Sequence, residues 1–539
     1  MNALAARLWI RLLCGLGMAF ASFWVPPAWA SDGVVRIAMV RTGETVDVTY
    51  TLPAPVTSLA LRLSEGPQPA ARIEVREDGL RLNRGRIEGI QPFTRITLRV
   101  TSDSTERDGV YPLARRLGSG GFVVYAPYLL PKERQARVTI GTTGRPRRLT
   151  VRASDGYVLV GASPERRDGF AFLAANDIAP SLAEEVKGRT SRLLAYYRSK
   201  LRRRPDVEPT IVLARYDLLP GMSRGLLRGD VSANGVVFLR TYVDVRAPSA
   251  EGPPPAQHAR FLAHELFHLW NRSRDPAREN AWLMEGGAEY AGWVATASLW
   301  PIEHRLKQSA GGALRTCMMY LGARPLSGLE EMQARSVRYP CGAVVHWAVD
   351  VAARAQGTGL DGFAIWRRLL AHRDRTGSYT LADYRAAVAE LAPAAAPRVE
   401  SLVGAGGIER WAALATALNG MGAEVRVSPP SEFVLRLAAA KALVLSACRE
   451  VHGVGENGGR LVVQAQDSCR EFGDDPAIEE AGGVSVLEAA AFYEAVRSRC
   501  EINGSINVVV NGERGRRAHR VRCDTAVEPP PPELTVVRA

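Results

Sequence analysis

Apolar and polar residues alternate in short bursts through the first 160 residues of the chain. Residues 46–51, 94–100 and 136–140 show this period of two, and Gly, Pro and Asp residues separate the bursts. Successive side chains of a strand point to opposite faces, so the alternation predicts strands with one buried face. We therefore expect an antiparallel β-sandwich over residues 31–165. Its sequence contains no catalytic cluster, which favours a role as a scaffold or as a wall beside a substrate.

A mixed pattern follows between residues 166 and 428. Residues 178–201 have a helical period, and residues 210–214 and 234–240 have the short apolar runs of strands. Further helical stretches lie at residues 285–299, 342–355, 363–372 and 381–391. We expect an α+β domain with a helical extension, ending at Pro429-Pro430.

The last hundred residues have their own order of elements. They predict two strands, a helix and two further strands, at residues 459–465, 482–486, 489–497, 505–510 and 518–522. This order predicts a small PDZ-like α/β module over residues 431–525, although the carboxylate-binding loop signature of PDZ domains is missing. The Pro-rich tail, residues 526–539, is expected to be extended. The whole chain is thus predicted to be a multidomain α+β protein.

The first thirty residues are typical of an export signal. Arg7 and Arg11 precede an apolar run over residues 12–25, and Ala28-Trp-Ala30 has the small residues of a cleavage site. An uncleaved membrane anchor is the alternative, and the run is short for a membrane span. We expect residues 1–30 to be a signal peptide and the mature protein to lie in the bacterial periplasm or outside the cell, without a stable membrane span.

Composition and charge limit the possible partners. A chain of 539 residues favours several domains, and 46% hydrophobic with 23% charged residues is ordinary for globular protein. The net charge of +13 is spread along the chain without interleaved aromatic residues or a nucleic-acid motif. Nucleic acid is therefore not an expected partner.

Six cysteines follow the predicted cleavage site, and an even number in an oxidising compartment favours disulfides. A sequence does not fix their connectivity. The hypothesis of nearest-neighbour pairing joins Cys317 to Cys341, Cys448 to Cys469 and Cys500 to Cys523.

The strongest chemical signal is the segment Phe261-Leu-Ala-His-Glu-Leu-Phe-His-Leu-Trp270. On a helix, His264 and His268 stand four residues apart and direct their imidazoles to one point, which makes a bidentate grip on a metal. Glu265 is placed to take a proton from water at the open position of that metal. The apolar residues around them suit a buried helix. The segment predicts a zinc hydrolase site.

A catalytic zinc takes three protein ligands, so the two histidines need a third partner. The best candidate is Glu285, in Trp282-Leu-Met-Glu-Gly-Gly-Ala-Glu-Tyr290, which predicts a second helix antiparallel to the first. Glu289 lies one turn further on and could accept the free N–H of a ligating histidine. A solvent-facing helix charge is the alternative for Glu289.

His264-Glu265-x-x-His268, with Glu285 seventeen residues further on, resembles the gluzincin metallopeptidases. The wording His-Glu-Leu-Phe-His-Leu-Trp-Asn is most similar to the glycyl aminopeptidase family, and more distantly to the aminopeptidase N and leukotriene hydrolase relatives. This resemblance implies a thermolysin-like catalytic domain, one Zn²⁺ per chain, and peptide or protein substrates. Residues 336–350 are similar to the family's Tyr-x-x-Gly-Ala segment, which implies that Tyr339 donates a hydrogen bond to the oxyanion. An ordinary packed tyrosine is the alternative.

The chain departs from the family pattern at one place. Aminopeptidase relatives carry Gly-x-Met-Glu or Gly-Gly-Leu-Glu on an edge strand, and its glutamate holds the free amine of the substrate. The corresponding region here is Gly229-Asp-Val-Ser-Ala-Asn-Gly235, which offers only Asp230 in a different order. Aminopeptidase and endopeptidase specificity both remain open.

Three functions are compatible with these residues. The first is an exported zinc metallopeptidase with Glu265 as its general base. The second is a weak or inactive gluzincin-fold protein that binds peptides or proteins of the cell envelope. It is less favoured because decay of catalysis would usually remove Glu265 or a ligand. The third is a zinc hydrolase with a non-peptide substrate.

Overall fold

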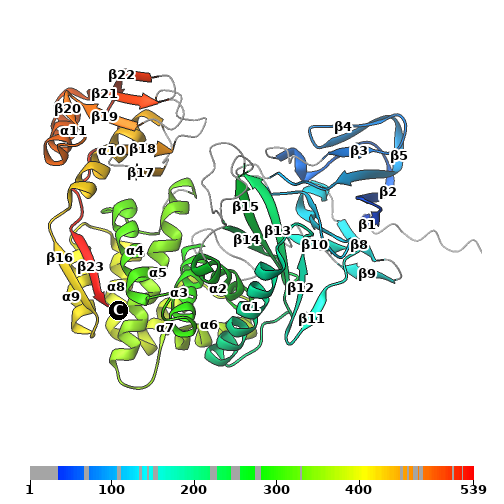
Figure 1. Cartoon of the computed structure of the whole chain (residues 1–539), viewed down its shortest axis with the longest axis horizontal. Coiled ribbons are helices and arrows are strands. Elements are labelled where there is room, and N and C mark those ends of the chain that lie inside the picture. Colours follow the sequence, from blue (N-terminus) through cyan, green and yellow to red (C-terminus); the bar gives the residue numbers. More distant parts are fainter. Residues whose placement is uncertain are drawn as a thin grey trace, which may run out of the picture.

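The computed structural model contains a β-rich region at one end, a central sheet with helices, and a C-terminal α/β part beyond a group of helices (Figure 1). The expected signal peptide, residues 1–30, lies outside the residues that the structure describes. The described residues are 34–65, 72–105, 111–132, 136–142, 145–149, 156–218, 227–244, 255–272, 281–327, 331–448, 453–457, 460–464, 472, 477–512, 515–524 and 526–539.

Two sheets make up the β-rich region. The larger has the strand order β3-β5-β2-β1-β8-β9, with β4 also paired to β5, and the smaller has the order β10-β7-β6. One hydrophobic core contains side chains from both sheets, as expected for alternating strands. The strands are β1 (Val35–Thr42), β2 (Thr45–Ala60), β3 (Ile73–Val75), β4 (Leu80–Asn83), β5 (Arg86–Thr101), β6 (Ala114–Arg116), β7 (Phe122–Tyr125), β8 (Ala136–Thr142), β9 (Arg145–Leu149) and β10 (Tyr157–Val160).

The prediction of a β-rich N-terminal region is confirmed, but its purely antiparallel arrangement is wrong at one pair. Strands β1 and β8 are parallel, with Ile37 opposite Val138. Many residues separate these strands along the chain, so the connection is long enough to return β8 in the same direction as β1.

A five-stranded sheet with the order β11-β12-β13-β15-β14 forms the base of the central region. Strands β12, β13 and β15 are parallel, whereas β14 is an antiparallel edge strand beside β15. Helices α1 (Pro180–Leu201) and α2 (Pro255–Asn271) pack on one face of this sheet (Figure 1). The strands are β11 (Glu165–Arg167), β12 (Phe170–Ala174), β13 (Thr210–Leu218), β14 (Leu227–Val231) and β15 (Val236–Asp244).

Helices follow the sheet, and two of them approach each other through glycines. A Cβ on Gly286 of α3 would lie 2.3 Å from the Cα of Gly342 of α5, so larger residues would force these helices apart. The disulfide Cys317–Cys341 joins α4 to α5, as the nearest-neighbour hypothesis predicted. The helices are α3 (Ala281–Leu299), α4 (Leu306–Leu321), α5 (Glu331–Ala355), α6 (Gly362–Thr376), α7 (Leu381–Leu391), α8 (Ala396–Glu400) and α9 (Arg410–Gly420).

The C-terminal part has its own hydrophobic core, built from a sheet of order β17-β18-β19-β21-β22 and two helices. The Cys500–Cys523 disulfide is present as predicted, and Cys448 is disulfide-bonded, whereas Cys469 lies outside the described residues. The PDZ-like character of this part stays a prediction. Its elements are α10 (Glu432–Cys448), β17 (Gly453–Asn457), β18 (Arg460–Gln464), β19 (Ala477–Ala481), β20 (Val484–Ser485), α11 (Ala489–Asn503), β21 (Ser505–Gly512) and β22 (Gly515–Arg522).

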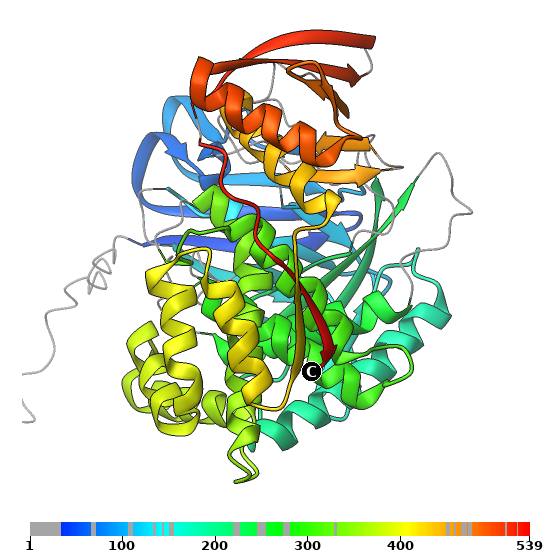
Figure 2. The same cartoon turned by 90° about the vertical axis from the view of Figure 1, so that its left-hand side faces the viewer.

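The tail predicted to be extended forms a strand, β23 (Glu533–Arg538). It pairs antiparallel with β16 (Glu424–Ser428), which precedes the C-terminal part in the chain, and Figure 2 shows the two strands side by side. Along the chain, the C-terminal part is therefore inserted between two strands that pair with each other in one small sheet. Of the helices in the described residues, none has the length and apolar character needed to cross a membrane.

Candidate metal centre

Helix α2 brings the two predicted histidine ligands together. Its apolar side, with Leu266 and Trp270, is buried in the main core. On another side of the same helix, the Nε2 atoms of His264 and His268 lie 3.2 Å apart. This arrangement follows from the four-residue spacing, which stacks side chains one above the other on a helix.

Helix α3 adds Glu285 to the pair. Its Oε2 atom lies 3.3 Å from Nε2 of His264 and 3.3 Å from Nε2 of His268, so the three atoms form a nearly equilateral triangle. Ligands at zinc distances of about 2.0–2.1 Å in a tetrahedron are separated from one another by about 3.3–3.4 Å. The triangle fits three corners of a tetrahedral zinc site, and the two-imidazole, one-carboxylate donor set suits that metal.

The helices are antiparallel and closely packed at this point. Glu285 contacts His268, and Glu289, one turn later, contacts the earlier His264. A Cβ on Gly292 would lie 3.4 Å from the backbone nitrogen of His264. Small residues on α3 therefore let it approach α2 closely enough for its carboxylates to reach the histidines.

Polar groups hold both histidines on the side away from the triangle. Nδ1 of His264 lies 3.1 Å from Oε2 of Glu289, whose Oε1 accepts a hydrogen bond of 3.0 Å from the Trp293 indole. Nδ1 of His268 lies 3.0 Å from Oδ1 of Asn271. These contacts occupy Nδ1 of each ring and leave Nε2 for a metal. Asn271 was not predicted, although its position three residues after His268 places it on the same helix face.

The charges of the site shift several pKa values. Burial alone raises the pKa of Glu289, but Arg260 and His264 outweigh burial and hold that pKa well below its usual range. Burial also raises the pKa of Glu285, but His268 and His264 outweigh burial and hold that pKa well below its usual range. Burial lowers the pKa of His264, yet Glu285 and Glu289 together raise it to about 10. The carboxylates next to the histidines are therefore ionised and available as ligands or hydrogen-bond acceptors.

Glu265 differs from these carboxylates. Only 7% of the residue is exposed, and burial raises the pKa of its carboxyl group, an effect that His264 and His268 offset in part. A raised pKa makes the carboxylate a stronger base, which favours transfer of a proton to it. Glu265 is therefore a buried carboxyl group with a raised pKa, beside the three residues that could hold a metal.

Tyr339 of α5 lies at the open side of the site. Its ring centroid is 5.6 Å from that of His264, and 39% of the residue is exposed. Burial, followed by the charges of Glu285 and Glu265, raises the pKa of Tyr339 far above its usual range. The phenol therefore keeps its proton and can act as a hydrogen-bond donor.

Edge strand β14 carries the region in which the amine-binding glutamate of aminopeptidase relatives is missing. Its Asp230 accepts a hydrogen bond of 2.6 Å from Nη1 of the buried Arg240.

Of the predicted site residues, the structure brings His264, Glu265, His268, Glu285, Glu289 and Tyr339 into one cluster.

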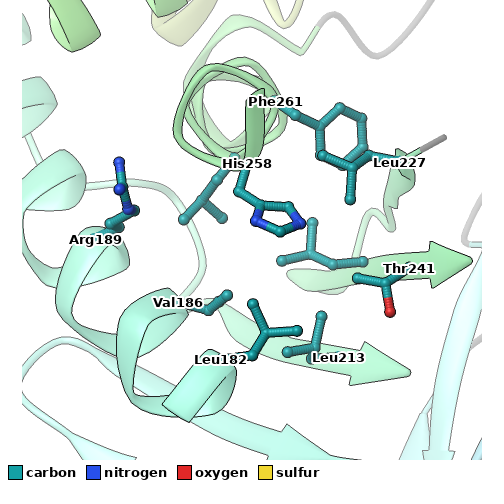
Figure 3. Close-up of a pocket in the computed structure, with 10 residues that line it drawn as sticks. Leu182, Val186, Arg189, Leu213, Leu227, Thr241, His258 and Phe261 are labelled. Carbon is teal, nitrogen blue, oxygen red and sulfur yellow. The ribbon is translucent and has the colours of Figure 1, made fainter. Parts of the chain in front are cut away.

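An apolar pocket lies on the sheet side of α2 (Figure 3). His258 lies within α2 and points its ring into this pocket, and Phe261 forms part of the wall. Neither ring nitrogen of His258 has a hydrogen-bond partner among the described residues. Leu182, Val186, Leu213 and Leu227 contribute to the apolar lining.

Comparison with solved structures finds the same architecture elsewhere. A crystal structure of an aminopeptidase N family protein from Idiomarina loihiensis has a TM-score of 0.55 and 12% sequence identity, covering 93% of this chain and 98% of that chain. The two chains share a fold. An M1 zinc metallopeptidase from Deinococcus radiodurans has a TM-score of 0.38 and 16% identity, covering 69% of this chain and 93% of that one, which is below the level of a shared fold. No family model and no curated protein matches the sequence.

Proposed function

We propose that this protein is an exported zinc metallopeptidase that hydrolyses peptide bonds. The observation that carries the proposal is the triangle of His264, His268 and Glu285, whose edges of 3.2–3.3 Å suit tetrahedral zinc. Glu265 and Tyr339 beside the triangle supply the remaining groups that amide hydrolysis requires.

Each residue of the site has a defined task in this proposal. When bound by His264, His268 and Glu285, zinc supplies a Lewis acid that activates water and polarises the scissile carbonyl. Glu265 accepts the proton of the attacking water and returns it to the leaving amine. Tyr339 donates a hydrogen bond to the oxygen that becomes negatively charged. Glu289 holds the ring of His264 in the orientation that ligation needs.

The fold shared with the aminopeptidase N family protein supports peptide or protein substrates. The sequence resemblance to the glycyl aminopeptidase family, with its Tyr-x-x-Gly-Ala segment, supports the same substrate class and a thermolysin-like catalytic domain. The Cys317–Cys341 and Cys500–Cys523 disulfides agree with an oxidising compartment, and the leader sequence supports export.

A peptide library with free and blocked N-termini tests the proposal. Protein stripped of metal and reloaded with zinc is expected to contain one zinc per chain and to cleave peptides only in the loaded form. Cleavage of blocked peptides would identify an endopeptidase, and cleavage of free N-termini alone would identify an aminopeptidase. Zinc binding without any peptide cleavage would contradict the proposal and favour a peptide-binding protein or a hydrolase of other substrates.

A further inference from the structure

The edge strand β14 touches the proposed general base through a glycine. A Cβ built on Gly229 would lie 2.9 Å from both Cγ and Cδ of Glu265, and 2.7 Å from Cζ of Phe261. Atoms in folded proteins do not pack this closely around a Cβ, so only glycine fits here without a shift of those side chains. The strand backbone is thus in direct packing contact with the stem of the Glu265 carboxyl group.

Backbone conformation does not explain the glycine. Gly229 is absent from the residues with positive φ and pairs regularly with Leu239 of β15. Glycine in the interior of a regular strand weakens it and often marks the close approach of another group. At position 229 the approaching groups are the ring of Phe261 and the side chain of Glu265.

We propose that Gly229 is a positioning residue, whose lack of a side chain allows β14 to set the place of the Glu265 carboxyl group. The inference rests on the proposed role of Glu265 as the general base. It assigns a catalytic reason to a strand that lacks the amine-binding glutamate of the aminopeptidase relatives.

Strand β14 is held in place because side chains of the β14–β15 hairpin form hydrogen bonds on the side away from Glu265. The backbone N–H of Tyr157 donates to Oγ of Ser232 over 2.5 Å, and Nδ2 of Asn234 donates to the Tyr157 carbonyl over 3.0 Å. Nη1 of Arg240 donates to the Tyr157 hydroxyl over 3.2 Å and to Asp230 over 2.6 Å. A methyl group added at Gly229 would therefore displace the facing side chains more readily than the strand.

The two facing side chains differ in what their movement would do. Phe261 forms a wall of the apolar pocket beside His258, so its ring has space into which it can turn (Figure 3). Glu265 is 7% exposed and belongs to the helical turn between both histidine ligands. Movement of either side chain would spare the fold, but movement of Glu265 would shift the reacting carboxyl group. Misplacement of a catalytic group by about 1 Å can lower a rate by about a hundredfold.

The test compares Gly229→Ala with Gly188→Ala in the zinc-loaded protein. Gly188 is the matched control, because a Cβ there meets nothing within 4 Å. For Gly229→Ala we expect kcat to fall by about ten- to a hundredfold, with KM within about threefold, one zinc per chain and little change in the melting temperature. Gly188→Ala should keep the wild-type kcat.

Two double variants identify the side chain that transmits the effect. Shortening the base in Glu265→Asp removes the crowded methylene, so Gly229→Ala should cost less in that background than in the wild type. Phe261→Leu should leave the cost of Gly229→Ala unchanged, and rescue by Phe261→Leu would overturn the inference.

The inference and the proposed function fail in different ways. A Gly229→Ala variant with kcat within twofold of the wild type, or with lost zinc, would overturn the inference while Glu265→Gln still abolishes turnover. If the wild-type protein and Glu265→Gln are equally inactive on peptides, the proposed function is overturned and the inference falls with it.

Discussion

Glu289 lies where it would support the proposed zinc site without ligating the metal. Its carboxylate faces Nδ1 of His264 at 3.1 Å and is held by Arg260 and Trp293, so its position is set from three sides. In the proposed zinc site, this contact would fix the tautomer of His264 and increase its basicity as a ligand.

Replacement Glu289→Gln should therefore weaken zinc binding by about 10- to 100-fold, because the amide carries no charge to support the imidazole. Competition with a chromophoric chelator measures this affinity. Unchanged affinity would instead show that the Glu289 carboxylate does not support the metal through His264.

Tyr339→Phe keeps the ring that lies beside His264 but removes the hydroxyl group. We expect kcat to fall by about a hundredfold or more with zinc content unchanged, because the hydrogen bond acts on charge that develops in the transition state. Steady-state kinetics on one cleaved peptide, with zinc analysis of the same sample, measures both quantities. Full activity would identify Tyr339 as a packing residue only.

Local sequence was informative at the residue scale where one helix determines the geometry. The four-residue spacing placed His264 beside His268, and the position of Glu285 in a second helix suggested the third ligand. Contacts that depend on tertiary packing were not predictable. The approach of Gly229 to Glu265 joins two elements whose relative position no periodicity encodes.

Among helices and strands, too, local features were predictable from the sequence and long-range pairings were not. The helical periods predicted α1, α3, α6 and α7 in nearly their observed positions, because a helical period is a local feature of the sequence. The parallel pairing of β1 with β8 and the pairing of β23 with β16 join strands far apart in the chain. Alternation indicates that a segment is a strand, but it does not specify the neighbour or the direction.

The β14–β15 hairpin provides a test at the element scale. Arg240→Met would leave the carboxylate of Asp230 in its largely buried place without the guanidinium at 2.6 Å. We expect the free energy of unfolding to fall by about 1–3 kcal/mol, because the carboxylate loses its nearest charged partner and keeps only the Tyr111 hydroxyl and the charge of Arg228. Adding Asp230→Asn to Arg240→Met should recover part of this loss. Urea unfolding of the two variants and the wild type measures it, and equal stability of all three would contradict the account.

On the scale of the whole molecule, the chain leaves the helical region after β16 and returns to it in β23, with a separately cored α/β part between them. We propose that this part is an independent module, as the sequence boundaries at residues 431–525 suggest. The boundaries at residues 31–165 and 166–428 likewise stay predictions.

The stability of the molecule in acid should depend on His346, a buried residue of α5 that contacts α3. Its Nε2 donates to the Leu283 carbonyl, Nδ1 faces the Tyr384 hydroxyl, and burial lowers its pKa to about 4, against the weaker opposite effect of the Leu283 bond. Between about pH 6.5 and pH 4 the unfolded chain binds one more proton here than the folded chain, so stability falls as the pH falls through this range.

The shift from 6.5 to about 4 corresponds to a loss of about 3 kcal/mol between these limits. Melting temperatures at closely spaced pH values measure the effect, and His346→Asn should show a shallower decline than the wild type. Parallel curves for the two proteins would contradict the assignment.

Turnover of Glu265→Gln at full zinc occupancy tests the central claim most directly, because it separates the base from the metal. We expect one zinc per chain in this variant and a peptidase kcat reduced by about a thousandfold or more, since both the geometry and the metal ligands are kept while proton transfer is lost. A parallel His264→Ala protein should lose the zinc itself. Wild-type peptidase activity in zinc-loaded Glu265→Gln would contradict the account.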